Sequence, residues 1–181
     1  MSRDSQRRLV YDAEHELRFI LDNGGTIALH GSTLTVPAER KFGDVAAARR
    51  YIEAVLSLPS VAAMAGADVP VTVRERAGAA KAHYEYDTAT IALPPHRPGR
   101  GNERAWALRE VVVLHELAHH LTRDGAPHGG EFAATFVHLL DVVVGPEAGH
   151  LLRVALWERG AVIDPVTSRG LESLREAAAH L

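Results

Sequence analysis

The spacing of hydrophobic residues divides the chain into helical and extended stretches. After Asp44, a residue type that favours a helix N-cap, apolar side chains recur every three or four positions until Pro59 stops the pattern. Asn102 is a similar N-cap for a later stretch, and the spacing continues through the C-terminal half. From residue 9 to residue 20 the spacing of the apolar residues fits a strand, a short helix or both. We predict helices over residues 45–58, 103–124, 131–143, 147–159 and 166–179.

An alternating pattern lies between these helical stretches. Residues 71–74 alternate apolar with polar side chains, and residues 81–94 alternate on both sides of a turn. Two prolines end the last strand, and prolines suit a sheet edge because they lack a ladder donor. We predict two or three strands, with residues 91–93 as an exposed edge strand. The whole pattern indicates an α+β fold, in which a small mixed or antiparallel sheet packs on a helix and a helical C-terminal half follows.

Length and composition suit one soluble globular domain. The chain has 181 residues, 46% of them hydrophobic and 24% charged, and we expect a single domain over residues 1–181. Its formal net charge of −3 gives no general attraction to nucleic acid or anionic membranes, so neither is an expected partner. No apolar run suits a signal peptide or a membrane span, so we expect a cytoplasmic protein. Because there is no cysteine, any metal must be held by His, Asp or Glu.

Four of the eleven histidines fall between residues 114 and 132. His115 and His119 are four positions apart on a predicted helix, so both imidazoles project from one face and can share one ion. Glu116 is turned away from them and can take a proton from water on that ion, as the H-E-x-x-H pattern implies. The spacing therefore predicts a zinc site with a general base. The alternative is the solvated polar end of an ordinary helix.

A catalytic zinc usually takes three protein ligands, so the chain must supply one more. We predict His128, because a Gly-Ala-Pro turn can bring the chain back over the face of the first two histidines. Glu131 and Glu147 on the following helices are alternative ligands, and Asp124 is close in sequence. Gly125 stands where the metzincin pattern has its third histidine, which excludes that pattern.

Three neighbouring residues have weaker signals. His120 is turned by about 100° from His119 along the helix, so we expect it to face outward or to support a ligand. Tyr84 and Tyr86 alternate with polar residues, so one face of that strand points inward and core packing is the expected role. Donation of a hydrogen bond to an oxyanion is the alternative role for a tyrosine there.

The motif resembles the zincin metallopeptidases, and more narrowly the SprT-like and WLM groups. It also resembles a small actinobacterial metallohydrolase family with the same signature. The resemblance is specific over residues 111–136 and only topological over residues 71–93. Pro127 and the lack of cysteines depart from the SprT-like pattern, so that group's DNA-linked role is not transferred. The matching residues are His115, Glu116, His119, His128, Gly129 and Phe132.

The resemblance implies a zincin fold, in which an extended peptide pairs with an edge strand above the metal helix. We therefore expect a zinc-dependent hydrolase that cleaves peptide or protein substrates, with Glu116 as the general base. A non-catalytic, metal-stabilised binding module is the alternative from a different class. A regulatory peptidase of the ImmA/IrrE-like kind would share the motif and differ only in substrate.

Overall fold

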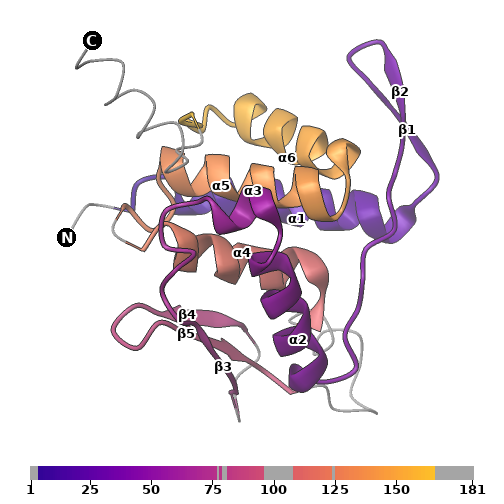
Figure 1. The fold of residues 1–181 in the computed structure, drawn as a ribbon. Coiled ribbons are helices and arrows are strands. Elements are labelled where there is room, and N and C mark those ends of the chain that lie inside the picture. The colour runs from indigo at the N-terminus through magenta and orange to yellow at the C-terminus, as the bar shows by residue number, and fades with distance from the viewer. Residues whose placement is uncertain (1–3, 77, 79–80, 96–107, 124, 166–181) are drawn as a thin grey trace.

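A mixed α+β architecture is seen in the computed structural model, which describes residues 4–76, 78, 81–95, 108–123 and 125–165 (Figure 1). Within these ranges the chain forms six helices, a two-stranded sheet and a three-stranded sheet. The helices are α1 (Arg7–Asn23), α2 (Val45–Leu56), α3 (Pro59–Ala62), α4 (Glu110–Leu121), α5 (Gly130–Val143) and α6 (Pro146–Glu158). The strands are β1 (Thr26–Leu29), β2 (Ser32–Thr35), β3 (Thr72–Glu75), β4 (His83–Glu85) and β5 (Thr90–Leu93).

Helix α4 lies in the middle of the molecule. It packs against α5 on one side and against β4 on the other, and α6 packs on both α1 and α5. Figure 1 shows α4 between the layer of α1, α5 and α6 and the three-stranded sheet. Every residue of α4 is buried, which is the expected environment of a helix that is apolar on most sides. Polar side chains on α4 therefore need partners inside the protein.

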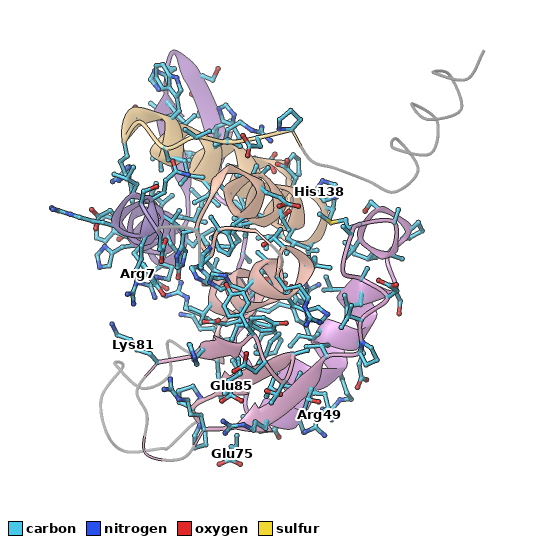
Figure 2. All side chains as sticks on the ribbon, turned by 90° about the vertical axis from the view of Figure 1, so that its left-hand side faces the viewer. Arg7, Arg49, Glu75, Lys81, Glu85 and His138 are labelled. Atoms are coloured by element: carbon cyan, nitrogen blue, oxygen red, sulfur yellow. The ribbon has the colours of Figure 1, made fainter. Side chains whose placement is uncertain are left out.

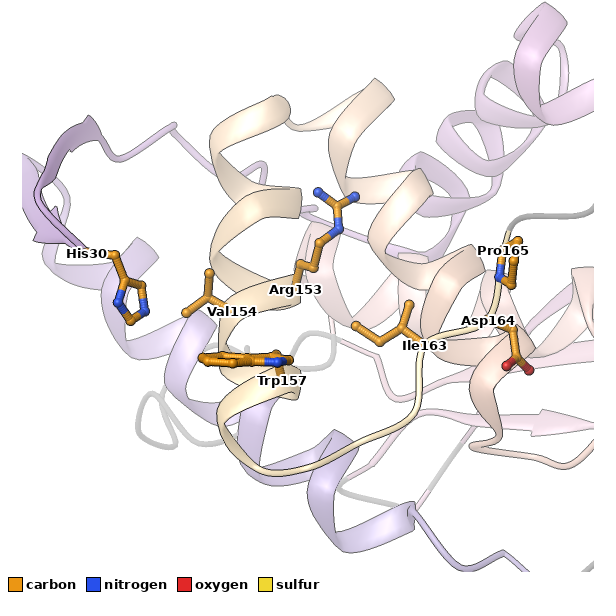
Figure 3. Close-up of a pocket in the computed structure, with 7 residues that line it drawn as sticks. All are labelled: His30, Arg153, Val154, Trp157, Ile163, Asp164 and Pro165. Atoms are coloured by element: carbon orange, nitrogen blue, oxygen red, sulfur yellow. The ribbon is translucent and has the colours of Figure 1, made fainter.

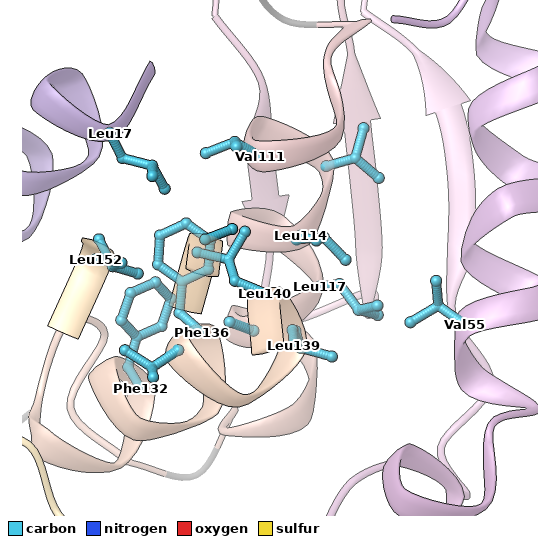
Figure 4. Packing of buried hydrophobic residues seen from close by; sticks show 14 of the residues in the cluster. Leu17, Val55, Val111, Leu114, Leu117, Phe132, Phe136, Leu139, Leu140 and Leu152 are labelled. Atoms are coloured by element: carbon cyan, nitrogen blue, oxygen red, sulfur yellow. The ribbon is translucent and has the colours of Figure 1, made fainter. Parts of the chain in front are cut away.

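The hydrophobic core fills the spaces on both sides of α4. Leu114 and Leu117 of α4 and Phe132 and Phe136 of α5 belong to one cluster, and all four side chains are fully buried (Figure 4). Burying such a side chain stabilises the fold by about 1.5–3 kcal/mol relative to leaving it exposed. Leu17, Val55, Val111, Leu139, Leu140 and Leu152 extend the same cluster to α1, α2, α4, α5 and α6.

The order of the three-stranded sheet corrects one prediction. Strand β5 lies in the centre, parallel to β3 and antiparallel to β4, and all four of its residues are buried. Residues 91–93 are therefore not an exposed edge strand. A short apolar run fits a central strand as well as an edge strand, and the two prolines follow the strand without interrupting its ladder. The edge strand that packs on α4 is β4.

The helix predictions that fall on described residues agree with the structure except at the start of α4. The predicted helices over 45–58, 131–143 and 147–159 are confirmed as α2, α5 and α6, and Asp44 caps α2 by accepting from Ala47 N. The opening segment is the helix α1. Helix α4 begins at Glu110, after an extended Arg109. The predicted N-cap Asn102 and the predicted helix over 166–179 lie outside the described residues.

Buried charges hold the start of α4. The Arg109 guanidinium pairs with Glu39 and with Asp22, and Glu39 also accepts from Val111 N at 3.0 Å. Glu110 accepts from the backbone N of Arg40 at 2.9 Å. These contacts tie the first turn of α4 to α1 and to the segment before α2, and so set the position of the residues one turn later. No described helix is both long enough and apolar enough to cross a membrane.

Candidate metal centre

Three buried histidines converge between α4 and the loop that precedes α5. His115 and His119 lie one turn apart on α4, and His128 lies two residues before Gly130, the first residue of α5. One ring nitrogen from each lies within 4.8 Å of the others, and the side chains are at most 6% exposed. The Nε2 atoms of His115 and His119 are 3.2 Å apart. The structure thus brings together the three residues that the sequence analysis predicted as ligands.

The outer nitrogen of each ring faces a different supporting side chain. His115 Nδ1 lies 2.8 Å from Glu14 Oε2, close enough for an ion pair although not aligned as a hydrogen bond. His119 Nδ1 lies 2.9 Å from the Tyr86 hydroxyl, and His128 Nδ1 lies 2.9 Å from Asp4 Oδ2. With each Nδ1 engaged in this way, the Nε2 atoms are the ones that point at the centre. Metal-ligating histidines usually have such a partner on the second nitrogen.

The donor set fits zinc. His128 Nε2 is buried and has no hydrogen-bond partner among the described residues, an arrangement that costs about 1–3 kcal/mol unless a ligand compensates for it. Two nitrogens about 2.0–2.1 Å from a tetrahedral zinc would be roughly 3.3 Å apart. The measured 3.2 Å between His115 and His119 agrees with that spacing. Imidazole nitrogen is also a preferred ligand of zinc.

Aromatic rings enclose the three imidazoles. The Phe132 ring centroid is 4.4 Å from that of His119 and 5.0 Å from those of His115 and His128. Tyr11 of α1 lies 5.3 Å from both His115 and His128. These rings restrict the rotamers of the imidazoles, so the convergent geometry is already present in the folded chain.

Glu116 lies beside the histidines and is not one of the clustered ligands. Its carboxylate accepts a hydrogen bond from the backbone N–H of Tyr84 in β4. Burial raises the pKa of Glu116 to about 7, in spite of the opposing charge of His115. A carboxyl group whose pKa lies near neutral pH can both accept and return a proton, as general acid–base catalysis requires.

A cavity of about 210 Å³ opens onto this group of residues. Glu116, His119 and His128 line it on one side. Tyr11 and Arg7 of α1 line another, and Tyr86 lies just beyond β4. In Figure 2, Arg7 marks the α1 wall and Glu85 marks strand β4 below it. The metal centre is therefore reached through a small space with both charged and aromatic walls.

The three proposed ligands titrate differently because their surroundings differ. Burial lowers the pKa of His119 well below its ordinary value and also lowers that of His128, and in both cases the charge of His115 adds to the effect. Burial acts on His115 in the same direction, but the nearby Glu14 carboxylate outweighs it and raises the pKa. Two of the rings are thus neutral at pH 7, the state in which imidazole binds a metal.

His120, next to His119 on α4, points into the core. It is fully buried, so the prediction that it faces outward is wrong. Its Nε2 lies 3.0 Å from the Val69 carbonyl oxygen, and its Nδ1 lies 3.1 Å from the Tyr84 hydroxyl. Burial lowers the pKa of His120, so this ring is also neutral. Tyr84 is buried in the core as predicted, and Tyr86 is only partly buried; both residues contribute to the lining of the cavity.

The alternative third ligands lie outside the histidine cluster. Glu131 is in the first turn of α5, and its carboxylate approaches Gly125 instead of the imidazoles. Glu147 is in the first turn of α6, beyond the far end of α5, and a helix of 14 residues spans about 21 Å. Asp124 is outside the described residues. Of the predicted candidates that the structure describes, His128 alone joins His115 and His119.

Sequence reasoning missed three residues of the centre, Asp4, Tyr11 and Glu14, all from the N-terminal segment. One of them had a usable signal. Glu14 falls on the same helical face as Val10, Ala13, Leu17 and Leu21, and all five are buried. A carboxylate on an apolar helix face needs a buried partner, which here is His115. Asp4 precedes the helix and carries no comparable pattern.

A second hollow, of about 720 Å³, lies along α6 (Figure 3). Trp157, Val154 and Ile163 make most of its wall apolar, and none of the clustered histidines lines it. It brings together no group of metal-binding side chains among the described residues. We assign no chemistry to it.

Comparisons of the chain with models of known protein families, with curated proteins and with solved structures found no match.

Proposed function

We propose that this protein is a zinc-dependent hydrolase that cleaves peptide bonds. One observation carries the proposal: three buried imidazoles converge beside a buried carboxylate, at a cavity that a substrate can enter. His115, His119 and His128 would hold zinc through their Nε2 atoms, and Glu116 would act as the general base. The cytoplasm is the proposed location, on the sequence argument alone.

The residues of the site divide the work of hydrolysis. Zinc held by the three histidines would supply a positive charge that polarises a carbonyl group and lowers the pKa of water from about 15.7 towards about 7. Glu116 takes the proton from the attacking water and later passes it to the leaving amine. The Tyr84 N–H orients that carboxylate, and Tyr11 and Phe132 keep the imidazoles in place. No serine or cysteine nucleophile is needed.

The edge strand supports a peptide as the substrate class. Strand β4 packs on α4, and its Tyr84 backbone reaches Glu116, so an extended chain beside β4 would pass the catalytic carboxylate. A sheet edge offers unpaired main-chain groups to such a segment. We therefore propose β4, in place of residues 91–93, as the edge strand that pairs with an extended peptide substrate.

A structural zinc site is the main competing interpretation. Structural zinc is usually closed by four protein ligands, whereas catalytic zinc keeps one position for water or substrate. The cluster among the described residues contains three histidines, and a cavity lies beside them. These two features favour catalysis over a purely structural role.

Substitution of Glu116 by Gln tests the proposal. Glu116→Gln keeps the size of the side chain and leaves the histidines unchanged, so we expect zinc content to stay at the wild-type level. Loss of the general base should lower kcat by about 10²–10⁴-fold. Zinc would be measured by atomic emission and turnover with a library of internally quenched peptides. The matched control is Glu147→Gln on α6, which should keep both zinc and activity.

Wild-type turnover by the Glu116→Gln variant would remove Glu116 from the mechanism. A wild-type protein that binds one zinc and cleaves no peptide in the library would contradict the peptidase assignment.

A further inference from the structure

Two neighbouring histidine–tyrosine pairs lie where α4 meets β4 and the residue after it. The Tyr84 hydroxyl is 3.1 Å from His120 Nδ1, and the Tyr86 hydroxyl is 2.9 Å from His119 Nδ1. The two tyrosine rings are also in contact, with centroids 4.9 Å apart. In each pair either the phenol or the imidazole can donate the hydrogen bond. The second nitrogen of each ring decides which of them does.

In the core pair, the tyrosine is the donor. His120 Nε2 lies 3.0 Å from the Val69 carbonyl oxygen, and a carbonyl oxygen can only accept. Nε2 therefore carries the proton of the neutral ring, and Nδ1 is bare. The Tyr84 hydroxyl must donate to it. The phenolic proton of Tyr84 is used inside the protein.

In the cavity pair, the donor and acceptor are reversed. His119 Nε2 faces the metal centre, 3.2 Å from His115 Nε2, and must be bare to serve as a ligand. With zinc on Nε2, the neutral ring would carry its proton on Nδ1, where the Tyr86 oxygen can accept it. The ring also has a hydrogen bond with the backbone of Pro127. Tyr86 keeps its own proton, and His119 is the only hydrogen-bond partner seen for this hydroxyl among the described residues. That proton is free to be donated.

The free proton of Tyr86 lies in the right place for a substrate. Tyr86 lines the same cavity as Glu116, His119 and His128, and its side chain is partly buried. We propose that the Tyr86 hydroxyl is a catalytic residue that donates a hydrogen bond to the substrate's carbonyl oxygen as that oxygen gains negative charge. This inference rests on the proposed hydrolase function, and it adds a second group that stabilises the transition state.

The reaction balances with water as the co-reactant. The water oxygen adds to the carbonyl carbon, one water proton passes to Glu116, and the carbonyl π electrons move onto oxygen. The Tyr86 hydroxyl stabilises that oxygen through a hydrogen bond without losing its proton. The carbon–nitrogen bond then breaks, Glu116 gives its proton to the amine, and the products are a carboxylic acid and an amine. Removing one such donor typically lowers kcat by about 10²–10³-fold.

The test compares Tyr86→Phe with Tyr51→Phe in the zinc-loaded protein. Tyr51→Phe removes a hydroxyl of the same kind from α2, where it bonds Glu110 at 2.7 Å, away from the cavity. The probe is acetohydroxamate, a small ligand of zinc whose oxygens accept hydrogen bonds, and its affinity is measured by calorimetry. Tyr86→Phe should weaken probe binding by about tenfold at full zinc occupancy. Tyr51→Phe should bind the probe like the wild type.

Kinetics supply a second readout on a peptide that the wild type cleaves. We expect Tyr86→Phe to lower kcat by about 10²–10³-fold with little change in KM. Equal probe affinity in Tyr86→Phe and wild type would overturn the proposal. It would also be overturned if excess zinc restored both readouts, because Tyr86 would then only position His119. Probe binding does not require turnover, so a wild type that cleaves no peptide would contradict the peptidase assignment while the probe still tests Tyr86.

Discussion

The two sides of α4 use the same pair of side chains for different purposes. On the cavity side, His119 and Tyr86 belong to the candidate metal centre, whereas on the core side His120 and Tyr84 are buried. The contacts are alike, with nitrogen–oxygen distances of 2.9 and 3.1 Å. They differ in the partner of the other ring nitrogen, which is the metal centre in one pair and a backbone carbonyl in the other. That partner determines the tautomer, and the tautomer determines whether the tyrosine has a proton to spare.

Elementary geometry explains why the pairs lie side by side. Adjacent residues on a helix point about 100° apart, so His119 and His120 face different neighbours. Tyr84 lies in β4 and Tyr86 starts the turn that follows it, and both hydroxyls reach α4. One turn of helix and one extended segment therefore produce a functional pair and a structural pair.

Substitution of His119 and of His120 should give the largest difference between the cavity side and the core side of α4. His119→Ala removes a proposed ligand, and we expect zinc affinity to fall by more than the 10–100-fold typical of losing a supporting residue. His120→Ala should keep zinc but destabilise the fold by about 1–3 kcal/mol, because it removes the buried hydrogen bonds of His120 with the Tyr84 hydroxyl and the Val69 carbonyl. Zinc affinity would be measured by competition with a chromophoric chelator, and stability by urea unfolding in EDTA.

Equal loss of zinc affinity in His119→Ala and His120→Ala would contradict the assignment of only His119 as a zinc ligand. His138→Ala, on α5 and outside the histidine cluster, is the matched control and should keep wild-type zinc affinity.

An intermediate effect should come from the carboxylate behind His115. Glu14 and His115 are both buried, and the charge of Glu14 raises the pKa of His115 against the effect of burial. Glu14→Gln removes the negative charge that strengthens this ligand, so we expect zinc to bind about 10–100-fold more weakly. Glu16→Gln, two residues later on α1 and more exposed, is the control. If both variants bound zinc like the wild type, the supporting role of Glu14 would be wrong.

The smallest effect is a difference in protonation that nitrogen-15 NMR can detect. In the zinc-loaded protein we expect the proton on Nδ1 of His119 and on Nε2 of His120. The pKa of His120 is lowered by burial, so its signals should titrate at a lower pH than those of an ordinary histidine. Identical tautomers in the two rings would contradict the proposed contrast.

Stability in EDTA should follow from the same pKa shifts. His119, His120 and His128 have lowered pKa values, so the unfolded chain binds more protons than the folded chain below about pH 6.5. Their contribution to stability is lost as the pH falls. His115 acts in the opposite direction, because its pKa is raised and its contribution is lost as the pH rises. Glu116, whose pKa burial raises to about 7, acts in the same direction as His115 over this range. With three groups against two, we expect the free energy of unfolding to fall only slightly on acidification from pH 7 to pH 5.5.

The sequence by itself determined the features that depend on local geometry. Four-residue spacing places His115 and His119 on one helix face whatever surrounds the helix. A short turn also brings His128 close to them, and the hydrophobic periods predicted α2, α5, α6 and the α+β class. These features follow from bond geometry and helical repeat over a few residues, which is why they can be read from the sequence.

Only the tertiary structure decided which groups surround those residues. The Tyr86 and Asp4 contacts join residues that are 33 and 124 positions apart, and no local pattern specifies such pairs. The central place of β5 also depends on which strands pair, and a short apolar strand fits either the centre or the edge of a sheet. Long-range packing determined the partner of each second nitrogen, and so placed one histidine–tyrosine pair at the candidate metal centre and the other in the core.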